Sequence, residues 1–453
     1  MTGEAKKIFG TDGARGVANT ELTPELAFAM GRAGAYILSE KKGTKAQILV
    51  GKDTRLSCDM LEAALVAGIC SVGADAVLVG VIPTPGVAYL VKSRQMDAGV
   101  MISASHNPME DNGIKFFDGT GYKLDDQSEN QIENIIHNHR DLPRPFGENI
   151  GIVIRDENLQ KDYIDFLKTT VNNMSLSGLK IALDLGNGAT YKIAPEVFEE
   201  LGAKVYSLHN SPDGKNINAN CGSTHMESLV EFIKENPVDL GIAFDGDGDR
   251  CLAADSKGNI IDGDELMSIY AACLKEKNVL KNNTLVITIM SNFGLKEMAS
   301  AKGITIEETK VGDRYVLEAM LNNNHNFGGE QSGHFIFLDY TTTGDGILSA
   351  LQLAKIMKET GQSLEELNTQ MVKKPQITVN AKVPNNKKED FDKPEQIAEA
   401  VNALKQKYEN LGQVIVRPSG TEPNVRITIK GQDQEIITKE ANELKELVEK
   451  ILN

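Results

Sequence analysis

Strand-like and helix-like segments alternate along this chain of 453 residues, and the same order occurs three times. Each occurrence contains three apolar segments of strand length that are separated by helical stretches. The segments are QILVGKD, AVLVGVI and AGVMISAS, then KIALDLGNG, AKVYSLH and DLGIAFDGDGD, and finally TLVITIMSN, ITIEETKVGD and NNHNFGGEQSGHF. This alternation predicts an α/β protein with three related βαβ-type domains. In open α/β sheets ligands bind beyond the carboxyl ends of the strands, so functional side chains are expected there.

The last part of the chain follows a different pattern. GQVIVRPSGTEPNVRITIKG predicts two strands around a tight loop. The helix that follows is expected to carry one apolar face, formed by Ile437, Ala441, Leu444, Val448 and Ile451. This pattern predicts a smaller C-terminal α+β domain. The four predicted domains are therefore residues 1–155, 156–258, 259–371 and 372–453.

The composition limits the classes of protein to consider. With 41% hydrophobic and 25% charged residues, the chain can bury several cores. No apolar run approaches the roughly 20 residues that span a bilayer, and MTGEAKKIFGTDG contains no signal-peptide segment. A cytoplasmic location without membrane association is therefore expected. The formal net charge of −16 argues against nucleic-acid binding, because it repels polyanions.

The cysteines and most histidines show no ligand spacing. The five cysteines form no CxxC pair, so reduced thiols are expected rather than a disulfide framework or a zinc site. Five of the seven histidines are expected to be structural or at the surface, and these are His137, His139, His209, His225 and His325.

The segment VMISASHNPMEDNGIKFF, residues 100–117, begins as an apolar strand that ends in Ser-His-Asn-Pro. The Asp-Asn-Gly that follows predicts a turn before the next apolar run. The hydroxyl of Ser105 is a weak nucleophile unless a base or a metal assists it, and His106 and Lys115 are close in sequence. These residues alone leave open a plain structural turn, a serine phosphatase and a noncatalytic sugar-phosphate receptor.

Three acidic residues alternate with glycine in DGDGDR, residues 245–250. In a straight strand alternate carboxylates would lie roughly 6.6 Å apart, too far to share one cation. Gly246 and Gly248 let the backbone curl, so the sequence predicts a divalent metal site; the alternative is a solvated acidic turn. An EF-hand is a poorer match, because its sixth position is Arg250 and its twelfth is Ser256.

A second polar cluster occurs in RPSGTEP, residues 417–423, with Arg426 just beyond it. It offers guanidinium groups, two hydroxyls and the amides of a glycine-containing turn, a combination that suits a phosphate. An ordinary hairpin turn is the alternative. Neither Walker A nor GxGxxG is present, so no motif supports a nucleotide cofactor.

Five motifs occur in order along the chain: TDGARG at 11–16, ASHNP at 104–108, DGDGDR at 245–250, GEQSGH at 329–334 and RPSGTEP at 417–423. With them the chain closely resembles the α-D-phosphohexomutase superfamily over essentially its whole length. The resemblance implies three related mixed-sheet α/β domains and a smaller fourth domain around a central cleft. FGTDGARG, KVGDRYV and GEQSGH further resemble the branch that interconverts glucosamine 6-phosphate and glucosamine 1-phosphate for amino-sugar and cell-wall biosynthesis. Glucose and mannose phosphates are the alternative substrates.

The resemblance also implies roles for particular residues. Ser105 would carry a phosphoryl group, which the loop after it exposes to the cleft. Mg²⁺ would bind an oxygen of phosphorylated Ser105 and the carboxylates of Asp245, Asp247 and Asp249. The transferring group would be surrounded by Arg15, His106, Lys115 and Arg250. Sugar hydroxyls would be held by Glu330 and Ser332, and the nonreacting phosphate by Arg417, Ser419, Gly420, Thr421 and Arg426.

The same resemblance implies the small molecules and the assembly. The substrate would be a hexosamine phosphate, with glucosamine 1,6-bisphosphate or glucose 1,6-bisphosphate as intermediate and activator. A homodimer through the first domain is expected. Asp313 in KVGDR stands where some phosphomannomutase relatives have His, so contacts of that loop do not carry over. The role of His334 stays open, because it can simply brace the loop of Glu330.

Overall fold

The computed structural model describes residues 7–10, 12–39, 45–409, 411–419 and 423–453. These residues form two compact units. One comprises the described residues up to Ile289 together with Ile306–Asn368, and the other comprises Met290–Thr305 with the described residues from Thr369 onward. The first unit holds two sheets and most of a third, and the second unit holds a fourth sheet.

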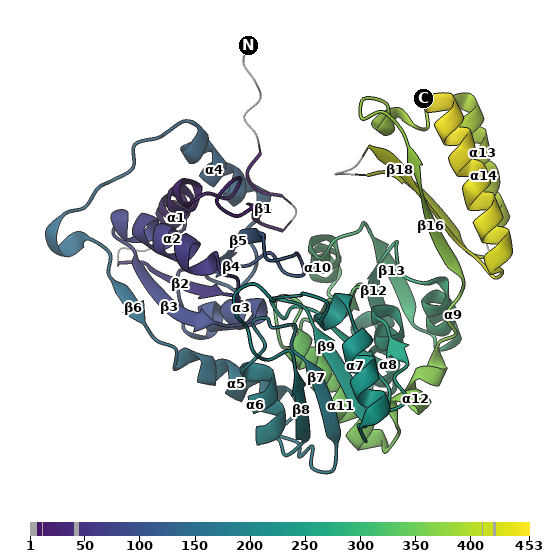
Figure 1. Ribbon diagram of the computed structural model, residues 1–453, viewed down its shortest axis with the longest axis horizontal. Helices are drawn as coiled ribbons and strands as arrows, with labels where there is room; N and C mark the ends of the chain where they lie inside the picture. Colours follow the sequence, from purple (N-terminus) through teal and green to yellow (C-terminus); the bar gives the residue numbers. More distant parts are fainter. Residues whose placement is uncertain (1–6, 11, 40–44, 410, 420–422) are drawn as a thin grey trace. The chain divides into compact units, whose positions relative to one another are not determined.

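The first sheet has six strands in the order β1-β5-β4-β2-β3-β6 (Figure 1, purple to blue). Its strands are β1 (Ala14–Val17), β2 (Gln47–Lys52), β3 (Asp75–Val81), β4 (Ala98–Ile102), β5 (Asp111–Asp118) and β6 (Val153–Arg155). Its helices are α1 (Pro24–Ser39), α2 (Cys58–Ser71), α3 (Thr84–Ser93) and α4 (Asp126–His137). The central strands β4, β2, β3 and β6 are parallel, β5 runs antiparallel to β4, and β1 is antiparallel to β5.

Helices cover both faces of this sheet, which explains its continuous apolar strands. Ile48 and Val50 of β2 belong to the same buried core as Leu61 of α2. On the other face, Gly51 approaches Val87 of α3. Parallel strands covered on both sides need apolar residues at every position rather than at alternate ones.

The second sheet has five strands in the order β11-β10-β9-β7-β8. Its strands are β7 (Lys180–Asp184), β8 (Lys204–Leu208), β9 (Leu240–Phe244), β10 (Cys251–Ala254) and β11 (Ile260–Ile261), and its helices are α5 (Leu159–Thr170), α6 (Ile193–Glu200) and α7 (Glu227–Glu235). Because β9, β7 and β8 are parallel, their carboxyl ends lie along one edge of the sheet.

The third sheet has four strands in the order β13-β12-β14-β15. Its strands are β12 (Thr284–Thr288), β13 (Thr305–Thr309), β14 (Phe327–Gly329) and β15 (Phe335–Phe337). The helices of this part of the chain are α8 (Gly263–Glu276), α9 (Phe293–Ala301), α10 (Asp313–Asn322), α11 (Gly346–Thr360) and α12 (Leu364–Leu367). Helix α8 begins with a capping box, in which the Asp262 and Glu265 side chains accept hydrogen bonds from each other's backbone N–H groups.

The fourth sheet is antiparallel, with the order β16-β18-β17. It consists of β16 (Gln376–Lys382), β17 (Gln413–Pro418) and β18 (Asn424–Lys430), and it packs with α13 (Glu395–Tyr408) and α14 (Gln434–Leu452). The apolar face predicted for α14 packs into the core of this unit. Four of its residues are buried, namely Ile437, Ala441, Leu444 and Val448, and the partly buried Ile451 packs against the same core. The short 3₁₀ helices of the chain are η1 (Gly147–Asn149), η2 (Gly222–Thr224), η3 (Lys281–Asn283), η4 (Asn368–Gln370) and η5 (Lys388–Asp390).

The nine strands predicted from the threefold pattern are all present, as are the two predicted after Gln376. The predicted Asp-Asn-Gly turn is wrong, because these three residues begin β5. Asn112 and Gly113 pair with Gly16 and Arg15 of β1, and the Asn112 side chain donates to Ser57 Oγ at 2.8 Å. Pairing with a distant strand therefore overrides the local turn preference.

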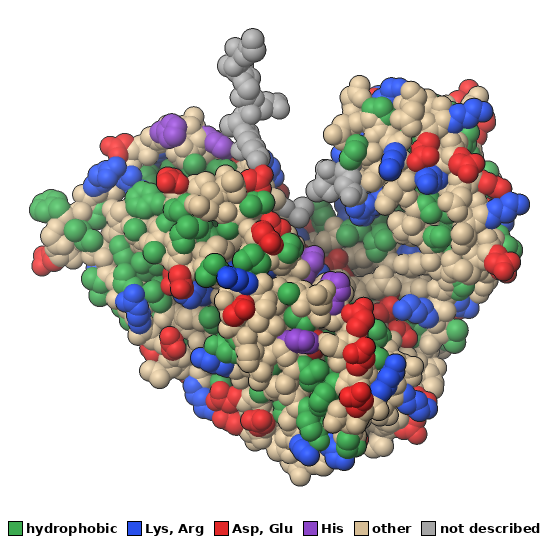
Figure 2. Space-filling view, viewed as in Figure 1, with side chains coloured by type: hydrophobic (Ala, Val, Ile, Leu, Met, Phe, Trp, Pro, Cys, Tyr) green, Lys and Arg blue, Asp and Glu red, His purple; other side chains and the backbone are tan. Residues whose placement is uncertain are grey.

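Charged side chains are spread over the surface of the protein. Figure 2 shows acidic and basic side chains interspersed over the visible face. Among the described residues, none of the helices has both the length and the apolar character that a membrane span requires.

Candidate active site

Ser105 lies in the turn between β4 and β5, with its backbone in the left-handed region at φ +54°. A non-glycine residue with positive φ is uncommon and persists where its surroundings hold it. The Ser105 N–H donates to Ser103 Oγ at 2.9 Å, and its carbonyl accepts from Arg55 Nη2 and Asn218 Nδ2, each at 2.9 Å. Three residues from separate parts of the chain therefore fix the Ser105 backbone.

Arg55 holds the turn of Ser105, although it was not among the predicted site residues. Its buried guanidinium pairs with Asp53 at 2.9 Å and donates to the carbonyls of Asn107 at 2.8 Å and Asp111 at 3.0 Å, in addition to Ser105. A guanidinium has five donors in a rigid plane, so one side chain can hold a whole turn. The only signal in the sequence is that Arg55 lies just beyond the carboxyl end of a predicted strand.

Ser105 is buried, which corrects the expectation that the following loop exposes it. The residue is 1% exposed, its Oγ donates to Asp245 Oδ2 at 2.6 Å, and His106 Nδ1 lies 3.4 Å from the same Oγ. The loop after β9 covers it closely, since a Cβ at Gly246 would come within 2.5 Å of the Ser105 carbonyl oxygen. The hydroxyl therefore lies among polar groups in the interior of the first unit.

The Asp triplet, Asp245, Asp247 and Asp249, follows β9 and is buried. One carboxylate oxygen from each residue lies within 4.8 Å of the others. The curl of the chain that brings them together requires Gly248, whose φ is +71°, a conformation that side chains disfavour. Thr84 Oγ1 at the start of α3 donates to Asp247 Oδ2 at 2.6 Å and so ties the loop to the first sheet.

The protonation and hydrogen bonding of the Asp triplet suit a bound cation. Burial, with the charges of Asp249 and Asp247, raises the pKa of Asp245 well above its usual range. Burial acts in the same direction on Asp247, but Lys115 and a hydrogen bond from Thr84 hold the pKa of Asp247 below its usual range. Asp247 Oδ1 and Asp249 Oδ1 are buried and have no hydrogen-bond partner among the described residues. Carboxylate oxygens left in this way fit a divalent metal ion.

Lys115 on β5 is a buried cation next to the Asp triplet. Its ammonium group donates to Asp247 Oδ2 at 2.9 Å, and it lies 3.0 Å from Asp12 Oδ2 and 4.0 Å from Asp249 Oδ2. Burial lowers the pKa of Lys115, but Asp12 and Asp247 outweigh it, so the pKa is raised and the side chain stays charged. Arg15 on β1 pairs with the same Asp12 carboxylate.

Arg250 and His106 complete the charged surroundings of Ser105. Arg250 Nε lies 3.8 Å from Asp249 Oδ1. Burial lowers the pKa of Arg250, but Asp249 and Asp245 raise it further, so the guanidinium stays charged. Burial, together with Arg250 and Arg15, lowers the pKa of His106 to about 4, so its ring is neutral at pH 7. The structure thus gathers all four predicted cationic or imidazole side chains near Ser105 and the Asp triplet.

The loop after β14 contributes Glu330, which is half-buried, and Ser332, which is exposed. Glu330 Oε1 accepts a hydrogen bond from the Gly312 N–H at 3.2 Å. Burial raises the pKa of Glu330 despite the opposing effect of His334. Glu330 therefore joins the KVGDR loop to the GEQSGH loop. The Ser332 side chain makes no hydrogen bond to any described residue.

His334 is buried between these loops and the Asp triplet. Its Nε2 lies 3.9 Å from Asp249 Oδ2 and 3.7 Å from Asp313 Oδ2. Asp313 in turn pairs with Lys123 of the first unit's N-terminal part at 2.6 Å. Neither ring nitrogen of the buried His334 has a hydrogen-bond partner among the described residues, so its role stays open.

The second polar cluster lies in the second compact unit. Arg417 on β17 pairs in register with Arg426 on β18, and Ser419 accepts a hydrogen bond from Lys388 Nζ at its carbonyl, at 2.7 Å. Partial burial and the neighbouring Arg426 lower the pKa of Arg417. Like charges on adjacent strands repel, so this arrangement favours a bound anion. Gly420 and Thr421 lie outside the described residues.

Comparison with known proteins places this constellation in a family. Models of phosphoglucomutase/phosphomannomutase match the chain in four parts: alpha/beta/alpha domain I at residues 6–142, domain II at 161–258, domain III at 262–374 and the C-terminal domain at 379–447. The chain belongs to the phosphoglucomutase/phosphomannomutase family. It is therefore an enzyme of the mutase class, an isomerase.

Within this phosphohexomutase family, the chain is most usefully compared with two curated relatives. A phosphoglucosamine mutase from Clostridium novyi is 55% identical over 449 residues, which is 99% of both chains. A phosphoglucosamine mutase from Caldicellulosiruptor saccharolyticus is 56% identical over 449 residues, 99% of this chain and 100% of the relative.

Solved structures of phosphohexomutases share the fold. A phosphoglucomutase/phosphomannomutase family protein from Burkholderia thailandensis matches with a TM-score of 0.83 at 21% identity, covering 99% of each chain. An N-acetylphosphoglucosamine mutase from Aspergillus fumigatus matches with a TM-score of 0.69 at 16% identity, covering 98% of this chain and 96% of the fungal one. At such identities the likeness concerns the fold.

Proposed function

We propose that this phosphohexomutase interconverts glucosamine 6-phosphate and glucosamine 1-phosphate by way of a phosphorylated Ser105. The observation that carries the proposal is the contact of Ser105 Oγ with Asp245 Oδ2 at 2.6 Å, inside a group of three buried aspartates. A hydroxyl held against a candidate metal site is suited to phosphoryl transfer. A plain turn would need neither the positive φ of Ser105 nor the buried carboxylates. A noncatalytic receptor would not need a serine at this contact.

The names of the relatives support the choice of substrate. Relatives that are 55% and 56% identical over the whole chain are phosphoglucosamine mutases. The fungal N-acetylphosphoglucosamine mutase of the same fold was solved with GlcNAc-6P and magnesium, and a variant of it with glucose 1,6-bisphosphate. These molecules support Mg²⁺ as the metal, and glucosamine 1,6-bisphosphate or glucose 1,6-bisphosphate as intermediate and activator.

The reaction consists of two phosphoryl transfers. In the first, the bond from phosphorus to Ser105 Oγ breaks and a bond from phosphorus to a sugar hydroxyl oxygen forms, while the proton of that hydroxyl passes overall to Ser105 Oγ. The sugar is then a 1,6-bisphosphate. It reorients and returns its other phosphate to Ser105. The rigid Ser105 backbone keeps Oγ in place for both steps, because Arg55 and Asn218 hold its carbonyl.

The metal would be held by Asp245, Asp247 and Asp249 together with an oxygen of the Ser105 phosphate. When bound, Mg²⁺ supplies positive charge that offsets the negative charge of the phosphoryl group in transit. The charged side chains of Lys115 and Arg250 offset further negative charge, as does Arg15. Neutral His106 lies beside Ser105 Oγ and can donate or accept a hydrogen bond there.

Sugar recognition is assigned to the loop after β14, and recognition of the distal phosphate to the second unit. Glu330 can accept hydrogen bonds from sugar hydroxyls, and the exposed Ser332 hydroxyl can also bind them. The facing Arg417 and Arg426, with Ser419, offer donors to a phosphate that does not react, and Gly420 and Thr421 are assigned to the same phosphate site from their sequence motif alone. The same proposal includes the predicted domain limits at residues 155, 258 and 371, the central cleft and the homodimer.

Parallel assays with three sugar phosphates test the substrate assignment. With matched Mg²⁺ and bisphosphate activator, we expect kcat/KM to be higher for glucosamine phosphate than for glucose or mannose phosphate. A site that only tolerates the amine keeps appreciable activity on glucose phosphate, whereas one that pairs with it rejects the analogue strongly. A clear preference for glucose or mannose phosphate would overturn the substrate assignment and leave the phosphohexomutase mechanism standing.

Arg417→Ala tests the distal phosphate site. Loss of a charge-assisted contact should weaken substrate binding by about 1.5–3 kcal/mol, roughly tenfold to over a hundredfold in affinity. Premature release of bisphosphate should also increase, and both changes are measured by steady-state kinetics with chromatography of the products. Lys439→Ala on α14 serves as a control cation in the same unit. Unchanged kinetic constants without added bisphosphate release would contradict the assignment.

A further inference from the structure

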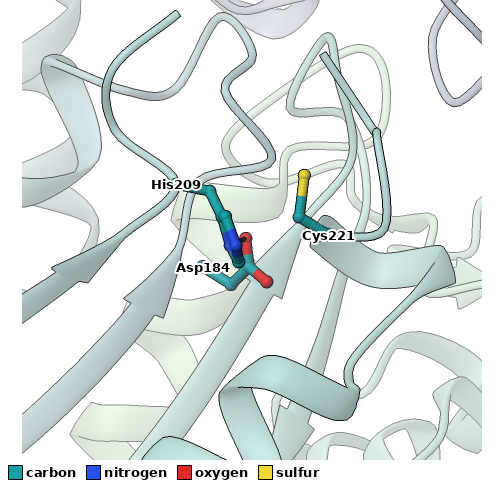
Figure 3. A group of neighbouring side chains, drawn as sticks. All are labelled: Asp184, His209 and Cys221. Atoms are coloured by element: carbon teal, nitrogen blue, oxygen red, sulfur yellow. Dashed lines mark hydrogen bonds and ion pairs between the residues drawn. The ribbon is translucent and has the colours of Figure 1, made fainter. Parts of the chain in front are cut away.

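A second group of candidate metal ligands lies apart from the Asp triplet. Asp184 is the last residue of β7, His209 follows β8 directly, and Cys221 precedes η2. Because β7 and β8 are parallel neighbours, Asp184 and His209 lie at the same edge of the second sheet. Donor atoms of the three residues lie within 4.8 Å of one another. Figure 3 shows the His209 ring beside the Asp184 carboxylate and Cys221 on an adjacent segment.

The Asp184 carboxylate is incompletely satisfied at this place. Its Oδ1 accepts hydrogen bonds from the Gly186 N–H and from His209 Nδ1, each at 3.0 Å. Its Oδ2 is fully buried and has no hydrogen-bond partner among the described residues. Buried polar atoms are almost always paired, so an orphaned carboxylate oxygen beside an imidazole and a thiol indicates a missing ligand.

The kinds of donor atom select the class of ligand. A carboxylate oxygen, an imidazole nitrogen and a thiol sulfur form a mixed set that Mg²⁺ and Ca²⁺ disfavour, because these ions prefer oxygen alone. Zn²⁺ binds all three donor types, usually with four ligands in a tetrahedron. We propose that Asp184, His209 and Cys221 form a zinc site, with solvent as the fourth ligand. Metal–ligand bonds of about 2.0–2.3 Å require the donor atoms, which lie within 4.8 Å of one another, to move closer together around the ion.

A catalytic thiol is the main alternative use of the same three residues. Burial and the nearby Asp184 raise the pKa of Cys221 to about 12, so its thiol is not activated as a nucleophile. Zinc binding would replace the thiol proton, which is released to solvent, and would leave the thiolate bonded to the ion. The half-exposed His209 side chain gives the ion a route to the site from solvent.

The site would stabilise the segment that supports Ser105. Residues 210–220 join His209 to Cys221, so one ion would tie both ends of this loop to β7. Within the loop, Asn218 Nδ2 donates to the carbonyls of Ser105 at 2.9 Å and Asn107 at 3.1 Å. The inferred role is therefore structural, and the zinc site does not depend on which sugar phosphate the enzyme uses.

Titration of the metal-free full-length protein with Co²⁺ tests the site. Co²⁺ replaces Zn²⁺ in such sites, and its bond to a thiolate produces a charge-transfer band in the near ultraviolet. Excess Mg²⁺ is present throughout, to compete for the oxygen-only Asp triplet. We expect one equivalent of Co²⁺ to produce the band and one equivalent of Zn²⁺ to abolish it. Absence of the band in the wild-type protein would overturn the proposal.

Two variants identify the ligands independently. Cys221→Ser should lose the band. His209→Asn should weaken binding by more than about 100-fold, and its backbone is preserved because asparagine tolerates the positive φ of 48° at this position. Cys273→Ser and the exposed His225→Asn are matched controls that should keep the band and the affinity. Retention of the band in Cys221→Ser, or unchanged affinity in His209→Asn, would overturn the site.

Discussion

Ser105→Ala is expected to lower kcat by at least about 10⁴-fold, the scale of effect that follows loss of a covalent nucleophile. The physical reason is that the variant lacks the hydroxyl oxygen that contacts Asp245 Oδ2 and that would accept the phosphoryl group. Steady-state assays in both directions measure the loss. Intact-mass and peptide analysis of the wild-type protein should find one phosphate on Ser105, and the variant should carry none.

Two controls make this result specific. Ser93→Ala removes an exposed serine at the end of α3 and should keep wild-type activity and phosphorylation at Ser105. Hydrogen exchange across residues 103–111 should show that the variant keeps its turn, because the contacts from Arg55 and Asn218 go to the Ser105 backbone. Full mutase activity in a folded Ser105→Ala protein would refute transfer through a phosphoserine.

Asp247→Ala is expected to lower kcat by about 10²–10³-fold, because the phosphoryl charge in transit loses electrostatic stabilisation. The affinity for Mg²⁺, measured by calorimetry without substrate, should fall at the same time. The fold should survive, since Lys115 keeps Asp12 at 3.0 Å as a partner. Glu231→Ala, at an exposed position on α7 beside the same sheet, is the carboxylate control and should keep wild-type rates.

The calorimetric measurement separates the metal from the chemistry. If Asp247→Ala binds Mg²⁺ as tightly as the wild-type protein, the Asp triplet is not the magnesium site. If the folded variant keeps normal rates in the presence of a chelator, metal assistance itself is refuted. Circular dichroism on each preparation shows that the variant being tested is folded.

Much of the fold follows from local pattern. Apolar runs such as the one in β4 and the apolar face of α14 are set by residues near one another in sequence, so their periodicity predicts them. The strands β1, β6, β10, β11, β15 and β16 were not predicted, and Asn112-Gly113 at the start of β5 was assigned to a turn. Short strands at sheet edges depend on a distant partner, and the pairing of Gly113 with Arg15 exists only in the folded chain.

The strand ends that carry Ser105 and the Asp triplet can be predicted from the sequence, because a strand followed by glycines or by Asn-Pro is a local property. The burial of Ser105 against Asp245 and the contacts of Arg55 with its turn become visible only in the folded chain. The grouping of Asp184, His209 and Cys221 likewise appears only in the fold, because their spacing along the chain matches no metal-ligand motif. Contacts between residues 25 to 140 positions apart depend on how sheets and loops pack, and short-range spacing carries no information about that packing.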